Sequence, residues 1–407
     1  MVRAFRAFRT FKTFIRRSLV IMAAGILLFT STFVNSVSAG PPQIDTYAVG
    51  AALIDVESGR ILYSEKGDEP MRIASLTKIM TAIVAIEYGK LSDTVKVSKN
   101  AYAKEGSSLY LKLGEEMSLN NMLYGLMLRS GNDAATAIAE HVGGSLEGFV
   151  YLMNEKAKEL GMKNSHFINP SGLDDGEGHY SSANDMAKLT AYALNNPVFQ
   201  EIVKTKAKKV PNPNEEWDYN WLNKNKMLGL FEGADGVKTG YTKLAKRCLV
   251  SSATRGGQQL AVVTLNDSND WSDHARLLQY GFANYPLKQI VSKGEAVQGS
   301  TGTASRSFYY PLLEEEQKLL QTGVVPIQED TMDYRLGQRG SLQILLDGKQ
   351  IGAVSLELAN SEGRGQQNQP VKEKSTFSFQ AGEMYKESFQ KHYWRMIKLV
   401  TRILFTF

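Results

Sequence analysis

The pattern of apolar and polar positions predicts strands at the start of the folded chain. Residues Ala48–Asp55 and 60–64 are apolar runs on either side of the polar tetrapeptide Val56-Glu57-Ser58-Gly59. Two such runs around a turn sequence are typical of a β-hairpin. A helix is predicted next: Ser75 precedes apolar residues at helical spacing, and Gly89 ends the pattern.

Helical spacing continues from about residue 118 to 195. It predicts helices over 119–128, 133–141, 146–160 and Ala183–Leu194. From Gly236 the pattern returns to strands, which are predicted at 237–242, 248–254 and 259–265, with a turn at Gly256-Gly257 and a helix over 273–285. The sequence therefore predicts an α/β fold: a sheet with helices on its faces and an inserted all-helical subdomain, spanning 40–285.

After residue 286 the chain becomes a series of short β-like runs, such as 342–346 and 352–358 around Asp347-Gly348. We predict a small β-rich domain over 286–372. It carries no catalytic motif, so a spacer and a docking surface remain equally open as its role. Residues 373–407 are predicted to be a linker and a terminal helix.

Residues 1–39 have the features of a signal peptide. Six basic residues and no acidic ones precede an apolar stretch from Leu19 to about Phe33, and Val37-Ser38-Ala39 offers small residues before a cut at Gly40. A retained membrane helix is the alternative, but the apolar run is short for a span of roughly 20 residues. Without this segment the net charge falls from +5 to about −1, so the basic balance gives no indication of nucleic-acid binding.

The C-terminal residues form an amphipathic pattern. On a helical wheel Tyr385, Phe389 and Tyr393 fall on one face with four further apolar residues, and Lys391, Arg395, Lys398 and Arg402 fall opposite. Such a helix suits the surface of an anionic membrane. A helix packed on the protein's own core is the alternative. We expect a peripheral anchor on the outer face of the cytoplasmic membrane.

Cysteine and histidine give no indication of a metal site or a disulfide. Cys248 is the only cysteine, and its apolar neighbours predict a buried strand position. The five histidines lack close ligand spacing, so we expect neither a metal nor a cofactor.

Three short motifs carry the chemistry. Ser75-Leu76-Thr77-Lys78, Ser130-Gly131-Asn132 and Lys238-Thr239-Gly240 occur in that order, which is the pattern of active-site-serine enzymes that recognise penicillin. Each motif alone is weak evidence for this chemistry. A second S-x-x-K stands at Ser388, and S-x-N recurs at Ser98, Ser118 and Ser182.

The first motif pairs a nucleophile with a base. Three residues apart on a helix, the side chains of Ser75 and Lys78 share one face, and a buried lysine beside a second cation, here predicted to be Lys238, can lose its proton and activate the serine. The alternative is a helix-capping Ser75 with a solvated Lys78.

The other two motifs have purely structural alternatives as well. Ser130 could relay a proton to the leaving group and Asn132 could bind a substrate amide, but a helix cap with a tight turn explains the same residues. Lys238 and Thr239 could hold a terminal carboxylate, with Gly240 allowing a substrate strand to approach, but a solvent-facing turn is the alternative.

Longer stretches around these motifs point to a family. They run from about Tyr47 to Phe282 and include residues 123–135, 166–174 and 237–242. On them the chain resembles the low-molecular-weight penicillin-binding proteins that act as serine-type D-alanyl-D-alanine carboxypeptidases. It looks most similar to the sporulation type of endospore-forming Gram-positive bacteria.

The resemblance implies a penicillin-binding fold with the active site between the sheet and the helical subdomain. By carry-over, Ser75 is the acylated nucleophile, Lys78 its base, and Ser130 and Asn132 form the second motif. Lys238, Thr239 and Gly240 form the third. The backbone N–H groups of Ser75 and Tyr241 form the oxyanion hole. The segment Asn223-Lys224-Asn225 also resembles the family, with no defined role.

The predicted function is removal of the terminal D-alanine from peptidoglycan stem peptides that end in D-Ala-D-Ala, with β-lactams acylating Ser75 as substrate mimics. A β-lactamase is the first rival, but no E-x-x-L-N segment follows Ser130 to supply an acid for deacylation. A wall-binding or β-lactam-sensing module that is acylated without turnover is the second rival.

Overall fold

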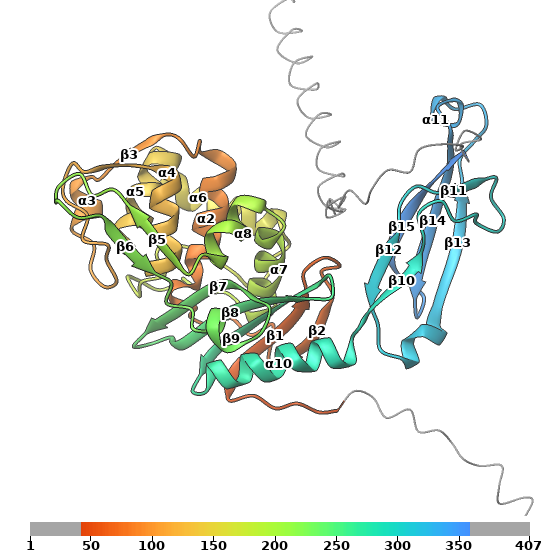
Figure 1. Ribbon diagram of the computed structural model, residues 1–407, viewed down its shortest axis with the longest axis horizontal. Helices are drawn as coiled ribbons and strands as arrows, with labels where there is room; N and C mark the ends of the chain where they lie inside the picture. Colours follow the sequence, from red (N-terminus) through yellow and green to blue (C-terminus); the bar gives the residue numbers. More distant parts are fainter. Residues whose placement is uncertain (1–41, 359–407) are drawn as a thin grey trace, which may run out of the picture. The chain divides into compact units, whose positions relative to one another are not determined.

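The computed structural model describes residues 42–358 (Figure 1). The predicted signal peptide and the predicted terminal helix lie outside these residues. Within 42–358, no helix combines the length and apolar character that crossing a bilayer requires.

A five-stranded antiparallel sheet forms the centre of the chain between residues 48 and 284, with strand order β2-β1-β9-β8-β7. The strands are β1 (Ala48–Asp55), β2 (Ile61–Glu65), β7 (Ala234–Thr242), β8 (Lys246–Arg255) and β9 (Gln258–Asp267). The hairpin predicted at the start of the chain is present, as are the three later strands. Because β2 and β7 are the two ends of this order, the strand with the third motif lies at an edge.

Side chains of β9 alternate between two cores, one on each face of the sheet. Leu260 and Val262 pack in the core that includes α10 (Asp270–Asn284). Ala261 and Val263 pack on the other face, in the larger core formed with the helical region. In Figure 1 α10 covers one face of the sheet, and helices of the segment between β2 and β7, among them α2 (Lys78–Tyr88) and α7 (Ala183–Leu194), lie on the other. This is the predicted α/β arrangement.

The helical region interrupts the sheet between β2 and β7 and also holds a short ribbon, β3 (Thr94–Lys96) with β4 (Glu116–Ser118). Its helices are α2 (Lys78–Tyr88), α3 (Lys99–Tyr102), α4 (Leu119–Tyr124), α5 (Asn132–Gly143), α6 (Leu146–Glu159), α7 (Ala183–Leu194) and α8 (Pro197–Lys204).

The helix predicted over 119–128 is divided in the structure. The α-helical part, α4, ends at Tyr124, and a π-helical segment, η2 (Gly125–Arg129), follows it. The apolar spacing of the sequence could not distinguish them, because Gly125, Leu126, Met127 and Leu128 are all buried. This wider turn leads directly into Ser130.

Residues 197–230 hold elements that the sequence pattern did not indicate. After α8 come a two-stranded ribbon, β5 (Ala207–Val210) with β6 (Tyr219–Leu222), and the short helix α9 (Met227–Leu230). Each ribbon strand buries only one residue, Val210 in β5 and Trp221 in β6, so there is no alternation to detect.

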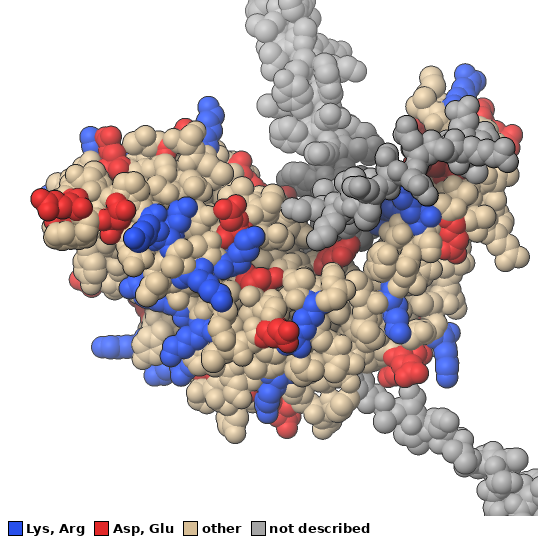
Figure 2. Space-filling model, in the orientation of Figure 1, with Lys and Arg blue, Asp and Glu red and all other residues tan. Residues whose placement is uncertain are grey.

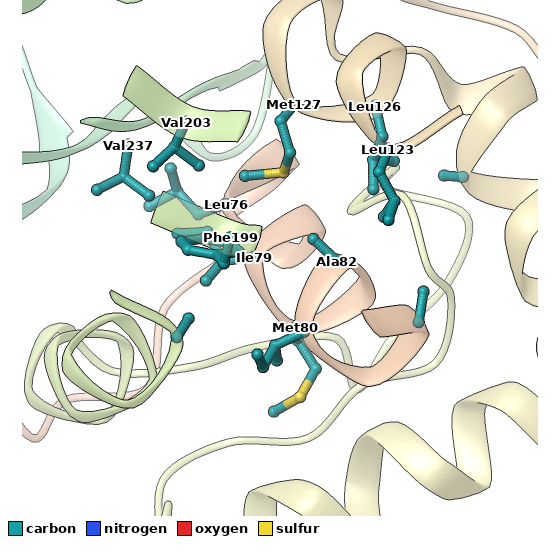
Figure 3. Packing of buried hydrophobic residues seen from close by; sticks show 14 of the residues in the cluster. Leu76, Ile79, Met80, Ala82, Leu123, Leu126, Met127, Phe199, Val203 and Val237 are labelled. Atoms are coloured by element: carbon teal, nitrogen blue, oxygen red, sulfur yellow. The ribbon is translucent and has the colours of Figure 1, made fainter. Parts of the chain in front are cut away.

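The helix that carries the first motif is anchored in the larger core. Figure 3 shows Leu76, Ile79 and Ala82 among side chains of η2, α8 and β7, including Met127 and Val237. All five are almost completely buried. Burial of each large side chain is worth roughly 1.5–3 kcal/mol, so the position of the first motif is well fixed.

Cys248 lies in β8 with 1% of its surface exposed, as the sequence predicted for a small core residue. Burial raises the pKa of its thiol to about 12, so it is not a reactive thiolate.

The residues from 287 to 358 form two small sheets around a core of their own. One pairs β10 (Leu287–Val291) with β12 (Phe308–Pro311); the other has the order β11-β15-β14-β13. The latter strands are β11 (Gly302–Ala304), β13 (Leu320–Pro326), β14 (Gln338–Leu346) and β15 (Lys349–Leu358). The β-like runs on either side of Asp347-Gly348 are β14 and β15.

Candidate active site

Ser75 lies in a short 3-10 helix, η1 (Ala74–Thr77), immediately before α2. Neither η1 nor α2 has a side-chain cap bond, so the capping alternative for Ser75 is not what the structure contains. Ala74 has φ +46°, a left-handed conformation that is uncommon for a residue with a side chain. Such a conformation persists where the surrounding structure enforces it, which is frequent at functional sites.

Lys78 is completely buried, and its ammonium group has three oxygen partners. Its Nζ donates to Ser75 Oγ at 3.1 Å, to Asn132 Oδ1 at 2.7 Å and to the carbonyl oxygen of Ser171 at 2.6 Å. These contacts join the first two motifs in one place.

The same geometry prepares the neutral amine to act as a base. The carbonyl oxygen of Ser171 can only accept hydrogen bonds. Asn132 Oδ1 can also only accept. The oxygen rather than the nitrogen of this amide faces Lys78, because Asn132 Nδ2 donates to the Glu105 carbonyl oxygen at 2.7 Å. Together they take both hydrogens of a neutral Lys78, which leaves its lone pair facing the Ser75 hydroxyl.

Burial, followed by the positive charge of Lys224, lowers the pKa of Lys78 to about 7, with Asp133 acting in the opposite direction. A substantial fraction of Lys78 is therefore neutral at neutral pH. The sequence prediction named Lys238 as the second cation. In the structure, Lys224 supplies the charge that lowers the pKa of Lys78 instead, because the pKa of buried Lys238 is itself held well below its ordinary value.

Lys238 has only 1% of its surface exposed, which is why it is a poor source of positive charge. Burial, with added repulsion from Lys78 and Lys224, holds the pKa of Lys238 well below its ordinary value. Its Nζ donates to the carbonyl oxygen of Thr239 at 2.7 Å. An arriving carboxylate would stabilise the charged form of Lys238 at this position.

The third motif lies on β7, directly against the turn that carries Ser75. A Cβ atom on Gly240 would come within 3.2 Å of the backbone nitrogen of Ser75 and of the Ile73 carbonyl oxygen. Glycine therefore allows the strand and the turn to approach closely. Tyr241, the next residue, is exposed. The outer side of this edge strand has no partner strand in the described sheet.

Ser130 connects η2 to α5 in a left-handed conformation, with φ +66°. It is buried, and its side chain caps neither helix. The three other S-x-N serines differ in this respect. Ser98, Ser118 and Ser182 each accept a hydrogen bond from a backbone N–H in the first turn of a helix. Ser130 is thus the S-x-N serine without an N-cap role.

Sequence reasoning missed the segment that supplies the Ser171 carbonyl. Next to it, Gly172 has φ +79°, and a Cβ there would lie 1.8 Å from the carbonyl oxygen of Ala74. Glycine is required at this contact by its conformation and by the available space. Residues 166–174 contributed to the family resemblance, but a backbone carbonyl has no signature in a sequence.

His179 is a second residue that sequence reasoning did not identify, and it supports the turn at Ser75 through Thr77. Its Nδ1 accepts from the Ile168 N–H at 3.2 Å, so the ring proton is on Nε2 and is donated to Thr77 Oγ1 at 2.7 Å. Thr77 in turn donates to the Ala74 carbonyl oxygen at 2.9 Å. Burial lowers the pKa of His179 to about 4, so this chain of hydrogen bonds is neutral at physiological pH.

Lys224 was predicted only as part of a resembling segment. Its backbone N–H donates to the Leu128 carbonyl oxygen at 3.1 Å, and its Nζ is 3.4 Å from Ser107 Oγ. Burial and the charge of Arg129 lower the pKa of Lys224.

The structure thus brings Ser75, Lys78 and Asn132 together by hydrogen bonds, and Lys238 and Lys224 by their charges. Within residues 42–358, no side-chain hydrogen bond joins Thr239 or Tyr241 to this group. Their predicted roles are toward the substrate.

A protein-family model described as D-alanyl-D-alanine carboxypeptidase matches residues 35–269. The chain is 38% identical over 295 residues to D-alanyl-D-alanine carboxypeptidase DacF of Bacillus subtilis, and the match covers 69% of this chain and 75% of that protein. It is 37% identical over 285 residues to DacC of Escherichia coli, covering 65% and 68% of the two chains.

Solved structures agree with the fold. The D-alanyl-D-alanine carboxypeptidase DacD from Francisella tularensis aligns with a TM-score of 0.62 at 27% identity, over 80% of this chain and 96% of that one. A mutant of the Streptomyces K15 DD-transpeptidase aligns with a TM-score of 0.56 at 33% identity, over 59% and 100%. The α/β penicillin-binding fold is confirmed, and the chain belongs to the D-alanyl-D-alanine carboxypeptidase family of serine hydrolases.

Proposed function

We propose that this chain removes the terminal D-alanine of peptidoglycan stem peptides through an acyl-enzyme on Ser75. The supporting observation is the contact between Lys78 Nζ and Ser75 Oγ at 3.1 Å, with the pKa of Lys78 lowered to about 7. A base whose pKa is close to the working pH is suited to proton transfer.

In the first step, neutral Lys78 accepts the proton of Ser75 while the serine oxygen attacks the carbonyl carbon of the penultimate D-alanine. The developing oxyanion accepts hydrogen bonds from the backbone N–H groups of Ser75 and Tyr241. The close approach of Gly240 to the Ser75 nitrogen is what allows two such donors to face one oxygen.

As the tetrahedral intermediate collapses, the bond between the carbonyl carbon and the D-alanine nitrogen breaks. Ser130 passes a proton to that nitrogen and is reprotonated from Lys78. Asn132 keeps Lys78 in position through its Oδ1, in addition to its predicted contact with a substrate amide. Water then hydrolyses the ester and releases the shortened peptide.

Substrate recognition rests on the third motif. Lys238 and Thr239 bind the terminal carboxylate, and the substrate backbone adds to the free edge of β7. A carboxylate beside Lys238 offsets the burial and repulsion that lower its pKa.

The test is release of D-alanine from a diacyl-L-Lys-D-Ala-D-Ala peptide by the wild type and by Ser75→Ala. We expect the variant to lose at least about 10⁴-fold in rate, because nucleophile and base act as one unit. Equal release by both proteins would eliminate the mechanism. A sensing module would be acylated by penicillin yet release no D-alanine, and a β-lactamase would turn penicillin over rapidly.

We also propose that the protein acts outside the cytoplasmic membrane, after export by residues 1–39, and is held at the membrane surface by residues 383–407. These 25 residues combine an aromatic and aliphatic face with a net charge of +3. A role in the spore or vegetative wall rests on the resemblance to the sporulation type and is tested by following wall cross-linking in a deletion strain.

A further inference from the structure

A cavity of about 310 Å³ opens beside the second motif, at the lower end of the range for small-ligand sites, roughly 300–1,000 Å³. Arg129, which lines the cavity, directly precedes Ser130, and Ser108 follows Ser107, whose carbonyl oxygen accepts the Asn132 N–H at 2.7 Å. The cavity therefore lies next to the segments that carry the second motif, on the side of the helical region.

Two buried carboxylates hold the walls of this cavity. Asp133 accepts from the backbone N–H groups of Leu109 and Leu111 and from the hydroxyl of Ser108, which fixes the first wall. Glu115 accepts from the Tyr219 hydroxyl at 3.0 Å and from Asn214 Nδ2 at 2.9 Å, which fixes the β5–β6 ribbon opposite. A pocket held on both sides in this way is preorganised for a ligand.

The lining combines aromatic surfaces with one cation and one anion. Tyr219 stacks on Trp221 with ring centroids 5.4 Å apart, and Tyr110 and Trp217 are 80% and 67% exposed beside them. Arg129 and Asp218 supply the charges. Such a surface suits an extended aliphatic side chain with a charged end.

Arg129 is available for a ligand carboxylate. Its Nη1 donates to the Leu222 carbonyl oxygen at 3.3 Å, and no carboxylate lies within ion-pair distance of it in the part of the chain that the structure describes. Its charge also acts on Lys224, which lowers the pKa of that lysine. Arg129 thus offers a positive charge at this entrance, unpaired among the described residues, with Asp218 also in the lining, and Figure 2 shows basic side chains gathered over the region of β5, β6 and α8.

The position of the cavity relative to the motifs indicates which part of a substrate enters it. If Lys238 and Thr239 hold the terminal carboxylate, the remainder of the peptide leaves the site past Ser130 and Asn132. The residue just before D-Ala-D-Ala then stands next to Arg129. A glycan strand lies several residues further along the peptide, at roughly 3.3–3.6 Å per residue, and is less well placed to reach the cavity.

We propose that this cavity binds the side chain of the stem-peptide residue that precedes D-Ala-D-Ala, and that Arg129 binds a carboxylate at the end of that side chain. The occupant is a diamino acid side chain ending in both an ammonium and a carboxylate group, which Asp218 and Arg129 pair respectively. The proposal rests on the proposed function and adds a specificity-determining residue to it.

The experiment uses two substrates that differ in one carboxylate. Nα-Acetyl-L-Lys-D-Ala-D-Ala, whose side-chain amine is free, and the same peptide with meso-diaminopimelate in place of lysine are compared by kcat/KM of D-alanine release. We expect the wild type to prefer the diaminopimelate peptide about tenfold, the effect of one charge-assisted hydrogen bond. Arg129→Gln should abolish the preference, because it slows the diaminopimelate peptide more than the lysine peptide. Lys163→Gln, an exposed charge on another loop, should keep it.

Failure of the proposed function and failure of the cavity assignment give different results. No D-alanine release from either peptide would overturn the proposed function. Release at equal rates by the wild type, or a preference that survives Arg129→Gln, would overturn only the assignment of the cavity. A preference for disaccharide-bearing peptides that is lost in Trp217→Ala would assign the cavity to the glycan instead. Covalent labelling of Ser75 by penicillin, together with an unchanged urea unfolding midpoint, shows that Arg129→Gln remains folded.

Discussion

At the scale of single residues, the chemistry depends on what surrounds one amine. Lys78 is buried between two acceptors that cannot donate, Asn132 Oδ1 and the Ser171 carbonyl oxygen, so its neutral form can only direct a lone pair to Ser75. Burial and the charge of Lys224 make that neutral form accessible near pH 7. The nearby Lys224 thus tunes the base without touching the nucleophile.

This tuning predicts the pH dependence of the reaction. Lys78 must be deprotonated to accept a proton, so kcat/KM should rise with pH on an acidic limb near pH 7, where its pKa lies. In Lys224→Gln a repelling charge is removed, Lys78 holds its proton more firmly, and the limb should move to higher pH. At pH 7 the activity should fall about two- to fivefold.

The control is Lys226→Gln, which removes an exposed charge two residues away. Its limb should coincide with that of the wild type. A limb that stays in place or moves to lower pH in Lys224→Gln would show that another group sets the pKa of the base.

A second prediction separates two serines in equivalent motifs. Ser118 caps α4, so Ser118→Ala should cost about 1 kcal/mol in the free energy of unfolding and leave acylation by penicillin intact. Ser130 is the C-cap residue of η2, but its side chain makes no cap bond to α5, so Ser130→Ala should change stability little but slow acylation about 100-fold or more. Urea unfolding and stopped-flow acylation measure both. If the two variants behaved alike, the proton-relay role of Ser130 would have no support.

At the scale of secondary-structure elements, the turn that carries Ser75 depends on the neighbouring segment 171–172. Gly172→Ala would place a Cβ on the Ala74 carbonyl oxygen and should cost about 3 kcal/mol or more, together with most of the acylation activity. Gly161→Ala is the matched control. Gly161 also has a positive φ, +66°, but has open space around its missing side chain, so the loss should be about 1 kcal/mol. Similar losses in both would mean that the contact with Ala74 is unimportant.

The elements that could be predicted were those with strong periodicity. The residues of α7 were predicted to its ends, because Ser182 caps a helix with a continuous apolar face. The division of 119–128 could not be predicted, since every residue of η2 but the last is buried whatever the helical pitch. The β5–β6 ribbon was not predicted, because each strand buries a single side chain and so shows no alternation.

The candidate site shows the same limit. The S-x-x-K spacing was enough to place Ser75 beside Lys78, since helical geometry fixes that distance. Ser171 acts through its backbone carbonyl and Lys224 through its charge alone, and neither leaves a pattern in the sequence. Only the folded chain brings residues 78, 171 and 224 to one place.

At the scale of the whole molecule, we expect the catalytic region and the proposed anchor to be separable. Truncation after Gly382 should transfer the protein from the membrane to the soluble fraction, because the aromatic face and the net positive charge of the tail are removed together. D-alanine release should be unchanged, since the three motifs of the candidate site lie between Ser75 and Gly240. Continued membrane association of the truncated protein would assign the anchor to another part of the chain.

The central claim is that the hydroxyl of Ser75 is the group that forms the acyl-enzyme. Peptide mapping by mass spectrometry after brief exposure of the full-length protein to benzylpenicillin measures this directly. We predict one covalent adduct, located on the peptide that contains Ser75 and absent from Ser75→Ala. An adduct at Ser388, in the second S-x-x-K sequence, or no adduct at all, would contradict the account.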